Sequence, residues 1–251
     1  MESLPLWSQY WIIAFLIVLF ASMIQGMTGF GAGLLVGPVL TLFLEPKLVV
    51  LIIMFTGIAN LLFVVHNARR HIYAARALPL IIPAIIGVPL GTYILHEVAS
   101  SVTSLAIACI SIIFSMVLLM GYYRPIKREA AASLGFGFMS GVMSAAVGMG
   151  GPPLVLFLSN QRWPKEIFRG TTAILFLLTG TLSIILYVIA GIATYSRVIS
   201  GASLIPAGII GFFVGNILFQ RVSAMIFLKI SLSLILVAGL TSLFINLSEI
   251  S

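Results

Sequence analysis

Two glycine- and proline-rich stretches interrupt otherwise apolar runs of the chain. The first, residues 25–38, reads QGMTGFGAGLLVGP, and the second, residues 144–153, reads SAAVGMGGPP. Glycine costs about 1 kcal/mol and proline about 3 kcal/mol per position inside a helix, so we expect both runs to break here. Irregular backbone survives at membrane depth only where protein buries it or where it lines a cavity. Two such breaks, in corresponding positions of two halves, indicate the binding site of a transporter.

The chemistry of these breaks is that of hydrogen-bond donors. A helix that begins inside the membrane leaves backbone N–H groups without intrahelical acceptors, and its dipole favours a negative charge at that end. Glycines let a ligand approach the backbone closely. The breaks are neutral and rich in donors, so they suit a small oxyanion better than a cation. The predicted substrate-binding residues are Gln25, Thr28, Gly29, Phe30, Gly31, Gly33, Asn60, Ser144, Gly148, Gly150, Gly151, Pro152, Arg169, Thr171 and Thr172.

Small residues also let membrane helices pack closely, and this is the alternative reading of each glycine. We assign Gly87, Gly91, Gly211 and Gly215 to such packing. For the two broken runs both readings stay open, and binding is preferred because their prolines and consecutive glycines exceed what packing needs. Threonine and serine hydroxyls within spans usually bond to the preceding turn of their own helix, so they are weaker candidates than the glycine backbone.

The composition is that of a polytopic membrane protein. Of the 251 residues, 61% are hydrophobic and 8% are charged, against roughly 25% charged residues in soluble domains. Apolar runs of about 18 residues recur along the chain, so we predict an all-α fold that lies in a lipid bilayer. The net charge of +7 arises mostly in short loops, where basic residues orient a membrane protein. It does not indicate binding to nucleic acid.

Two halves with the same plan are expected within one integrated transmembrane domain. Residues 1–123 form the first repeat, residues 124–131 a basic cytoplasmic linker and residues 132–251 the second repeat. Paired glycines, a Pro-Lys pair, a Thr-Gly pair and an Ile-Ile-Gly segment recur in the same order. They begin at Gly29 and Gly148, Pro46 and Pro164, Thr56 and Thr179, and Ile85 and Ile209. The helices are predicted at 11–25, 34–44, 48–66, 78–95 (interrupted by three prolines), 102–121, 132–147, 154–159, 171–190, 198–219 and 225–247, with an amphipathic connector at 161–169.

The distribution of arginine and lysine chooses between two topologies. If each broken run crosses the membrane once, basic loops fall on both sides. If each run enters and returns, nearly all basic loops share one face, and only Lys47 and Arg197 lie on the other. The second arrangement is preferred. It gives each half five segments, so the halves are inverted relative to each other, with both termini outside.

The residues missing from the spans restrict the mechanism. No span carries a carboxylate well inside it, so a proton relay or a sodium site based on buried Asp or Glu is not expected. Export of an anion through an inside-negative membrane needs no such coupling, because the potential supplies about 2.3 kcal/mol per charge per 100 mV. The spans also lack catalytic or metal-binding constellations, so we expect no enzyme, no metal and no cofactor.

The two breaks also carry a resemblance to a known family. Residues 25–38 and 147–153 resemble the paired glycine motifs of the sulfite exporter TauE/SafE family, and the similarity extends over nearly the whole chain, including the connector that leads into residues 168–172. In the first motif Ala32 interrupts what is often a consecutive glycine pair. The resemblance implies a multi-pass transporter of the bacterial inner membrane for sulfite, sulfonates such as sulfoacetate, or related organic anions.

Two classes of function remain in competition. The favoured one is a secondary transporter or facilitator of a small anion, acting as an exporter. The alternative is a membrane scaffold subunit that transports nothing and binds a partner through its basic cytoplasmic loops. The identity of the anion, a coupling ion and assembly into a homo-oligomer stay open.

Overall fold

The computed structural model of the chain describes residues 4–68, 74–120, 128–161, 163–218 and 224–248. Within these ranges the fold consists of eleven helices, and no strand occurs. Seven helical stretches of the described chain are long and apolar enough to span a bilayer. The prediction of an all-helical polytopic membrane protein is confirmed.

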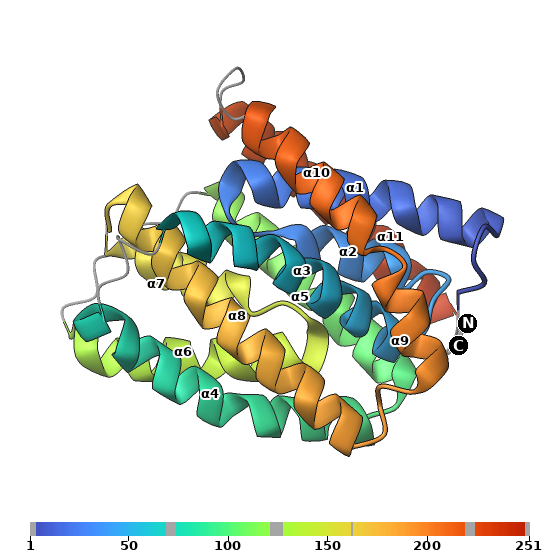
Figure 1. The fold of residues 1–251 in the computed structure, drawn as a ribbon, viewed down its shortest axis with the longest axis horizontal. Helices are drawn as coiled ribbons and strands as arrows, with labels where there is room; N and C mark the ends of the chain where they lie inside the picture. The colour runs from blue at the N-terminus through green and yellow to red at the C-terminus, as the bar shows by residue number, and fades with distance from the viewer. Residues whose placement is uncertain (1–3, 69–73, 121–127, 162, 219–223, 249–251) are drawn as a thin grey trace.

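The helices run mostly along the long axis of the molecule (Figure 1). The first five are α1 (Gln9–Thr28), α2 (Ala32–Leu40), α3 (Pro46–Ala68), α4 (Ala74–Glu97) and α5 (Ser100–Met120). The others are α6 (Glu129–Val147), α7 (Gly151–Asn160), α8 (Lys165–Ile189), α9 (Tyr195–Ala202), α10 (Ile205–Leu218) and α11 (Ala224–Ser248).

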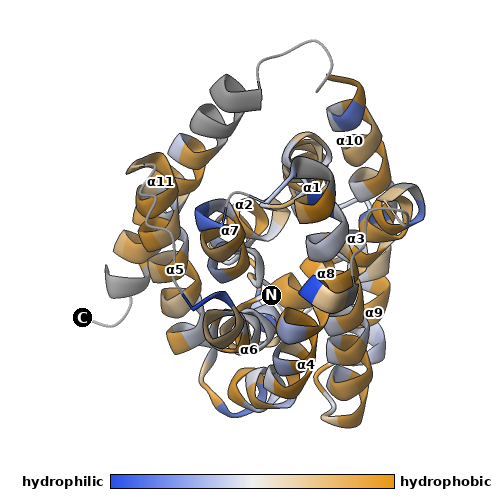
Figure 2. Ribbon diagram, turned by 90° about the vertical axis from the view of Figure 1, so that its left-hand side faces the viewer, coloured by the Kyte–Doolittle hydropathy of each residue, from blue (hydrophilic) through white to orange (hydrophobic). Residues whose placement is uncertain are grey.

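The outer faces of the bundle are apolar, as a lipid environment requires. Large hydrophobic side chains are exposed on many helices, for example Leu16, Ile86, Ile113, Ile185 and Val237. Figure 2 shows that hydrophobic residues predominate along most of the helices. A water-soluble protein rarely exposes apolar surface on this scale, whereas lipid-facing helices must.

Two predictions about proline and the connector were wrong. Pro79, Pro83 and Pro89 lie inside α4 without interrupting it, because packing against neighbouring helices makes prolines tolerable in membrane helices. Residues 165–169, predicted as part of a connector, are the first residues of α8, and Pro164 is its N-cap residue. The connector is therefore shorter than predicted, and Arg169 lies on a spanning helix.

The predicted helix at 198–219 is also corrected, because it is two helices. The chain breaks between α9 and α10, where the Leu204 N–H donates to the Gly201 carbonyl oxygen at 3.3 Å. Pro206 follows at the start of α10. A proline ring clashes with the carbonyl group four residues earlier, here that of Ala202, and this clash favours a break at this point.

Close glycine contacts join the two halves of the chain. Helix α4 packs along α6, and α10 packs along α1. A Cβ atom at Gly87 would lie 2.5 Å from the Phe138 carbonyl oxygen of α6, and one at Gly211 would overlap the Leu19 carbonyl oxygen of α1. The packing role predicted for Gly87, Gly91, Gly211 and Gly215 is confirmed. Each interface pairs a helix of one half with a helix of the other, while the inverted repeat itself stays a prediction.

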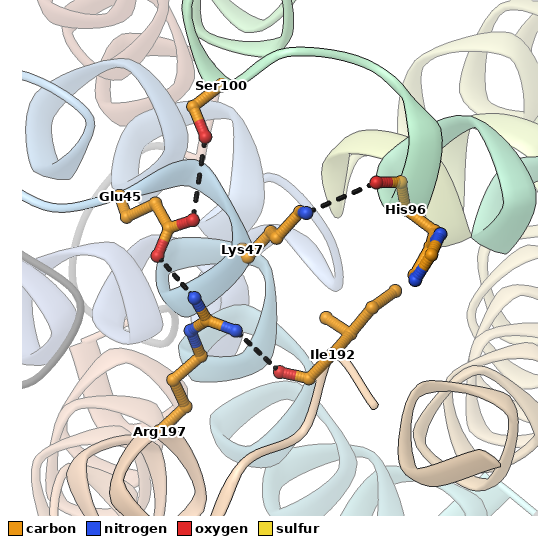
Figure 3. Close-up of polar contacts among 6 residues, drawn as sticks. All are labelled: Glu45, Lys47, His96, Ser100, Ile192 and Arg197. Carbon is orange, nitrogen blue, oxygen red and sulfur yellow. Dashed lines mark hydrogen bonds and ion pairs between the residues drawn. The ribbon is translucent and has the colours of Figure 1, made fainter. Parts of the chain in front are cut away.

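A polar cluster joins three turns at one end of the bundle (Figure 3). The Arg197 Nη2 donates to Glu45 Oε2 at 2.7 Å, and Arg197 Nη1 donates to the Ile192 carbonyl oxygen at 3.1 Å. The Lys47 Nζ donates to the His96 carbonyl oxygen at 3.2 Å. Lys47 and Arg197, which the charge-based topology places on one face, therefore lie at the same end.

The opposite end carries Arg76, whose guanidinium carbon lies 5.7 Å from the centre of the Trp163 ring. Trp163 Nε1 in turn donates to Glu129 Oε1 at 3.0 Å. We call this end, with Arg76, Arg128 and the start of α8, the basic end. The other loop residues that the topology argument used lie outside the described residues: Arg69, Arg70, Arg124, Lys127, Arg162 and Arg221.

Substitution of Arg197 by methionine is expected to lower the free energy of unfolding by about 2 kcal/mol. The side chains of Arg197 and Glu45 are only 12% and 16% exposed. An exposed ion pair contributes about 1 kcal/mol or less to the free energy of unfolding, and breaking a buried pair costs about 3–5 kcal/mol. We place this partly buried pair between these two limits. Thermal unfolding in detergent measures the loss. The double variant Glu45→Gln/Arg197→Met is expected to recover part of it, because no carboxylate is then left without its partner.

The matched control is Glu97→Gln. Glu97 pairs with His96 at 2.9 Å, and these side chains are 55% and 47% exposed. An exposed pair contributes little, so the unfolding temperature is expected to stay close to that of the wild type. Equal losses in Arg197→Met and Glu97→Gln would contradict a special role for the buried pair.

Candidate functional site

Both predicted breaks occur, and left-handed glycines form them. Helix α1 ends at Gly29 with φ +86°, and Gly31 precedes α2 with φ +97°. Helix α6 ends at Gly148 with φ +73°. Residues with a Cβ rarely adopt this conformation, which explains why glycine is placed at these helix ends. The two helix ends close alike: Gly29 N donates to Gln25 O at 2.7 Å, and Gly148 N to Ser144 O at 2.9 Å.

Each broken run returns to the end of the bundle from which it started. Trp11 Nε1 in the first turn of α1 donates to Ser203 Oγ beside α9, and Glu45 after α2 pairs with Arg197 of α9. In the second run, Glu129 at the start of α6 accepts from Trp163, which follows α7. The two limbs are unequal, because α1 and α6 have 20 and 19 residues while α2 and α7 have 9 and 10.

A cavity of about 80 Å³ lies between the two breaks. Its wall consists of the end of α1, the start of α2, the end of α6, the start of α7 and the middle portions of α3 and α8. The breaks touch each other, because a Cβ atom at Gly33 would lie 2.5 Å from the Gly148 carbonyl oxygen. The cavity is therefore a joint product of both sequence halves.

Nine of the fifteen predicted site residues line this cavity. They are Gln25, Phe30, Gly31, Gly33, Ser144, Gly148, Gly150, Gly151 and Pro152. Thr28, Gly29, Asn60, Arg169, Thr171 and Thr172 do not line it. The hydroxyl groups of Thr28 and Thr172 donate to carbonyl groups four residues earlier, at 2.9 Å in both cases. These two threonines follow the alternative reading, in which a hydroxyl bonds to its own helix.

The cavity also has lining residues that the sequence reasoning did not propose. Helices α3 and α8 contribute Ile53, Met54, Gly57, Ile58, Leu61, Phe176 and Gly180, and the breaks add Ala32 and Met149. The repeated Thr-Gly pair could have predicted Gly57 and Gly180 as lining residues, because a glycine in the middle of a span leaves room beside its helix. The preceding threonine is not part of the wall, since Thr56 Oγ1 donates to the Ile52 carbonyl oxygen at 2.7 Å.

Two helix starts form part of the cavity wall. Ala32, Gly33 and Leu34 form the first turn of α2 and line the cavity, and their N–H groups have no preceding helical turn to bond to. At the start of α7 the lining amides are those of Gly150 and Gly151. The next two residues of α7 are prolines, which have no N–H group. None of the described residues that line the cavity is charged, so the helix dipoles and backbone amides are the groups of this wall that can favour a negative ligand.

Comparison with known families identifies this arrangement. The family model of the sulfite exporter TauE/SafE matches residues 14–242, a range that includes both breaks and the whole cavity wall. The chain belongs to the TauE/SafE family. It is therefore a multi-pass membrane transporter. Searches of the curated proteins and of the solved structures found no match.

In this TauE/SafE member, Asn60 orients the side-chain amide of Gln25. Asn60 is fully buried on α3, and its Nδ2 donates to Gln25 Oε1 at 3.0 Å and to Ser22 Oγ at 3.3 Å. Because the Oε1 atom of Gln25 is engaged by Asn60, the amide end that remains for the cavity is its Nε2 donor. We propose that Asn60 acts as a positioning residue, which presents a donor rather than an acceptor at the cavity wall.

Asn60→Leu is expected to raise the KM for the transported anion about five- to tenfold. The substitution frees the Gln25 amide to rotate, and one hydrogen bond contributes on the order of 1 kcal/mol. Initial rates over a range of anion concentrations measure the change. The control is Thr56→Val one turn earlier, because the Thr56 hydroxyl bonds within its own helix. A KM that is unchanged in Asn60→Leu would contradict the positioning role.

Proposed function

We propose that this TauE/SafE transporter is a facilitator of small anions, which holds its substrate with backbone amides at the two helix breaks. One observation carries the proposal: the starts of α2 and α7 face a single cavity beside the middle of α3 and α8. Both helix starts present the positive ends of their dipoles to the same space. An oxyanion is the ligand that satisfies several converging N–H groups at once.

The size of the cavity supports a substrate of few atoms. One water molecule occupies about 10–15 Å³, so a space of about 80 Å³ suits a ligand of few heavy atoms. The proposed substrates are sulfite and short sulfonates such as sulfoacetate, which have few heavy atoms. Ile53 and Phe176 line the apolar part of the wall, and such a wall strengthens amide–anion interactions by excluding water.

Export is the proposed direction. The positive-inside rule assigns the basic end to the cytoplasm, which puts the two termini outside. The proposed location is a bacterial inner membrane. An inside-negative potential then drives an anion outward at about 2.3 kcal/mol per charge per 100 mV. Uptake needs a coupling ion, and no carboxylate is found among the described residues of the cavity wall. The cavity favours transport over the scaffold alternative, because a scaffold that binds through its loops has no use for it.

The test is flux through the purified protein in proteoliposomes. Radiolabelled sulfite and sulfoacetate are expected to cross at rates that rise with an imposed membrane potential of the matching sign. A thermal-shift panel of inorganic and organic anions, amines and sugars is expected to show stabilisation by anions. Absence of anion flux, together with stabilisation by amines or sugars alone, would overturn the proposed function.

A further inference from the structure

Arg169 lies on the wall of the bundle close to the cavity but outside it. It is part of the apolar spanning stretch of α8 and belongs to the second turn of this helix, near the basic end. Its aliphatic stem lies against the end of α1, because a Cβ atom at Gly29 would be 3.7 Å from Arg169 Cγ. Gly29 is followed by Phe30, which lines the cavity. One residue of the first break therefore separates the arginine stem from the cavity wall.

The guanidinium group of Arg169 has few partners. Its Nη2 donates to Asn216 Oδ1 of α10 over a long distance of 3.4 Å, and its Nε is buried without a hydrogen-bond partner. Among the carboxylates whose side chains are described, Glu45 and Glu97 belong to the opposite end, and Glu129 accepts from Trp163. None of these three carboxylates compensates the charge of Arg169, whose side chain is partly buried, and a partly buried guanidinium attracts an anion.

The aromatic rings beside Arg169 connect it with the cavity. The Phe30 ring lies 6.5 Å from the ring of Phe168, the residue that precedes Arg169. Phe30 also faces the start of α7, because a Cβ atom at Gly151 would lie 4.0 Å from Phe30 Cβ. Phe30 therefore lies between the start of α8, which carries Arg169, and the start of α7.

We propose that Arg169 and Asn216 form a second anion subsite, at the basic-end mouth of the cavity, which captures the substrate before it passes Phe30. This inference rests on the proposed function and adds a charged binding site, which the substrate reaches before the neutral cavity. The guanidinium suits an oxyanion because its fork of N–H donors matches two oxygen atoms of a sulfite or sulfonate group. A purely structural role is the competing explanation, because a cation near the end of α1 stabilises the helix dipole.

The test measures sulfite uptake into inverted vesicles, whose outer face is the basic end. Arg169→Gln is expected to raise the KM for sulfite about tenfold or more, with the maximal rate kept within a few-fold. Added salt is expected to raise the KM of the wild type and to affect the variant less. Arg169→Lys is expected to recover only part of the affinity, because an ammonium lacks the fork. The control is Arg128→Gln, an exposed charge at the same end, which is expected to leave the KM unchanged.

Calorimetry with sulfite separates the two sites. Gly57→Leu, which fills the cavity, is expected to bind sulfite still, and Gly57→Leu/Arg169→Gln is expected to lose this binding. An unchanged KM in Arg169→Gln, or a lower unfolding temperature as its only defect, would overturn the subsite. Failure of Gly57→Leu to bind sulfite would overturn it as well. If the wild type carries no anion, the proposed function fails alone, and loss of sulfite binding in Gly57→Leu/Arg169→Gln relative to Gly57→Leu still decides the subsite.

Discussion

Leucine at position 57 is expected to abolish anion transport while the protein stays folded. Gly57 lies in the middle of α3 and lines the cavity, and no atom lies within 4 Å of the place that a Cβ would take. A leucine side chain can therefore enter the cavity without displacing backbone. Leucine is also a better helix former than glycine by nearly 1 kcal/mol, so α3 is not weakened. Flux of radiolabelled sulfite or sulfoacetate is expected to fall to the level of protein-free liposomes.

The matched control for this prediction is Gly135→Leu. Gly135 lies on α6, is also surrounded by open space, and does not line the cavity. The variant is expected to transport at the wild-type rate. Gly150→Leu is a poorer choice, because a Cβ there would lie 2.8 Å from the Ser140 carbonyl oxygen and would combine blockage with misfolding. Wild-type flux through Gly57→Leu would show that the substrate does not pass this cavity.

Alanine at position 141 is expected to destabilise the protein by about 3 kcal/mol. Gly141 of α6 faces α4, and a Cβ there would overlap the Ala84 carbonyl oxygen. Backbone cannot rotate out of the way, so the added methyl group must push the two helices apart. Overpacking costs about 1–3 kcal/mol and occasionally more, and a clash with backbone belongs at the upper end. The unfolding temperature in detergent measures the effect.

The comparison is with Gly135→Ala on the same helix. Nothing lies within 4 Å of that site, so the methyl group meets no neighbour, and the helix gains up to about 1 kcal/mol from the better propensity of alanine. The expected order of unfolding temperatures is Gly135→Ala at or above the wild type and Gly141→Ala well below it. Equal temperatures for the two variants would contradict the close backbone contact between α4 and α6.

Most errors about the fold concerned where helices end, and they share a cause. Pro79, Pro83 and Pro89 suggested an interruption that α4 does not show, because tertiary packing overrides local propensity in a membrane helix. Pro206, by contrast, marks a real break, which the apolar run 198–219 concealed. A proline has the same local chemistry in both helices. Whether the backbone opens depends on the neighbouring helices, which a single stretch of sequence does not contain.

The candidate site was only partly predictable for the same reason. The residues at the breaks were accessible to local reasoning, since their glycines and prolines dictate the backbone. On the straight spans, the wall of the cavity depends on which side of each helix faces inward. Thr56 does not line the cavity, whereas its neighbour Gly57 does. Helix α3 is apolar on every side, so its inward face is not visible in the sequence.

The sequence by itself determined that the chain enters a bilayer, that it is helical, and that two of its apolar runs break at glycines. These properties follow from hydropathy and from backbone preferences over a few neighbouring residues. The tertiary structure decided that Gly33 meets Gly148 and that the middle portions of α3 and α8 complete one cavity between the breaks. Such contacts join segments more than a hundred residues apart, and they depend on how all the helices pack together rather than on the chemistry of any one segment.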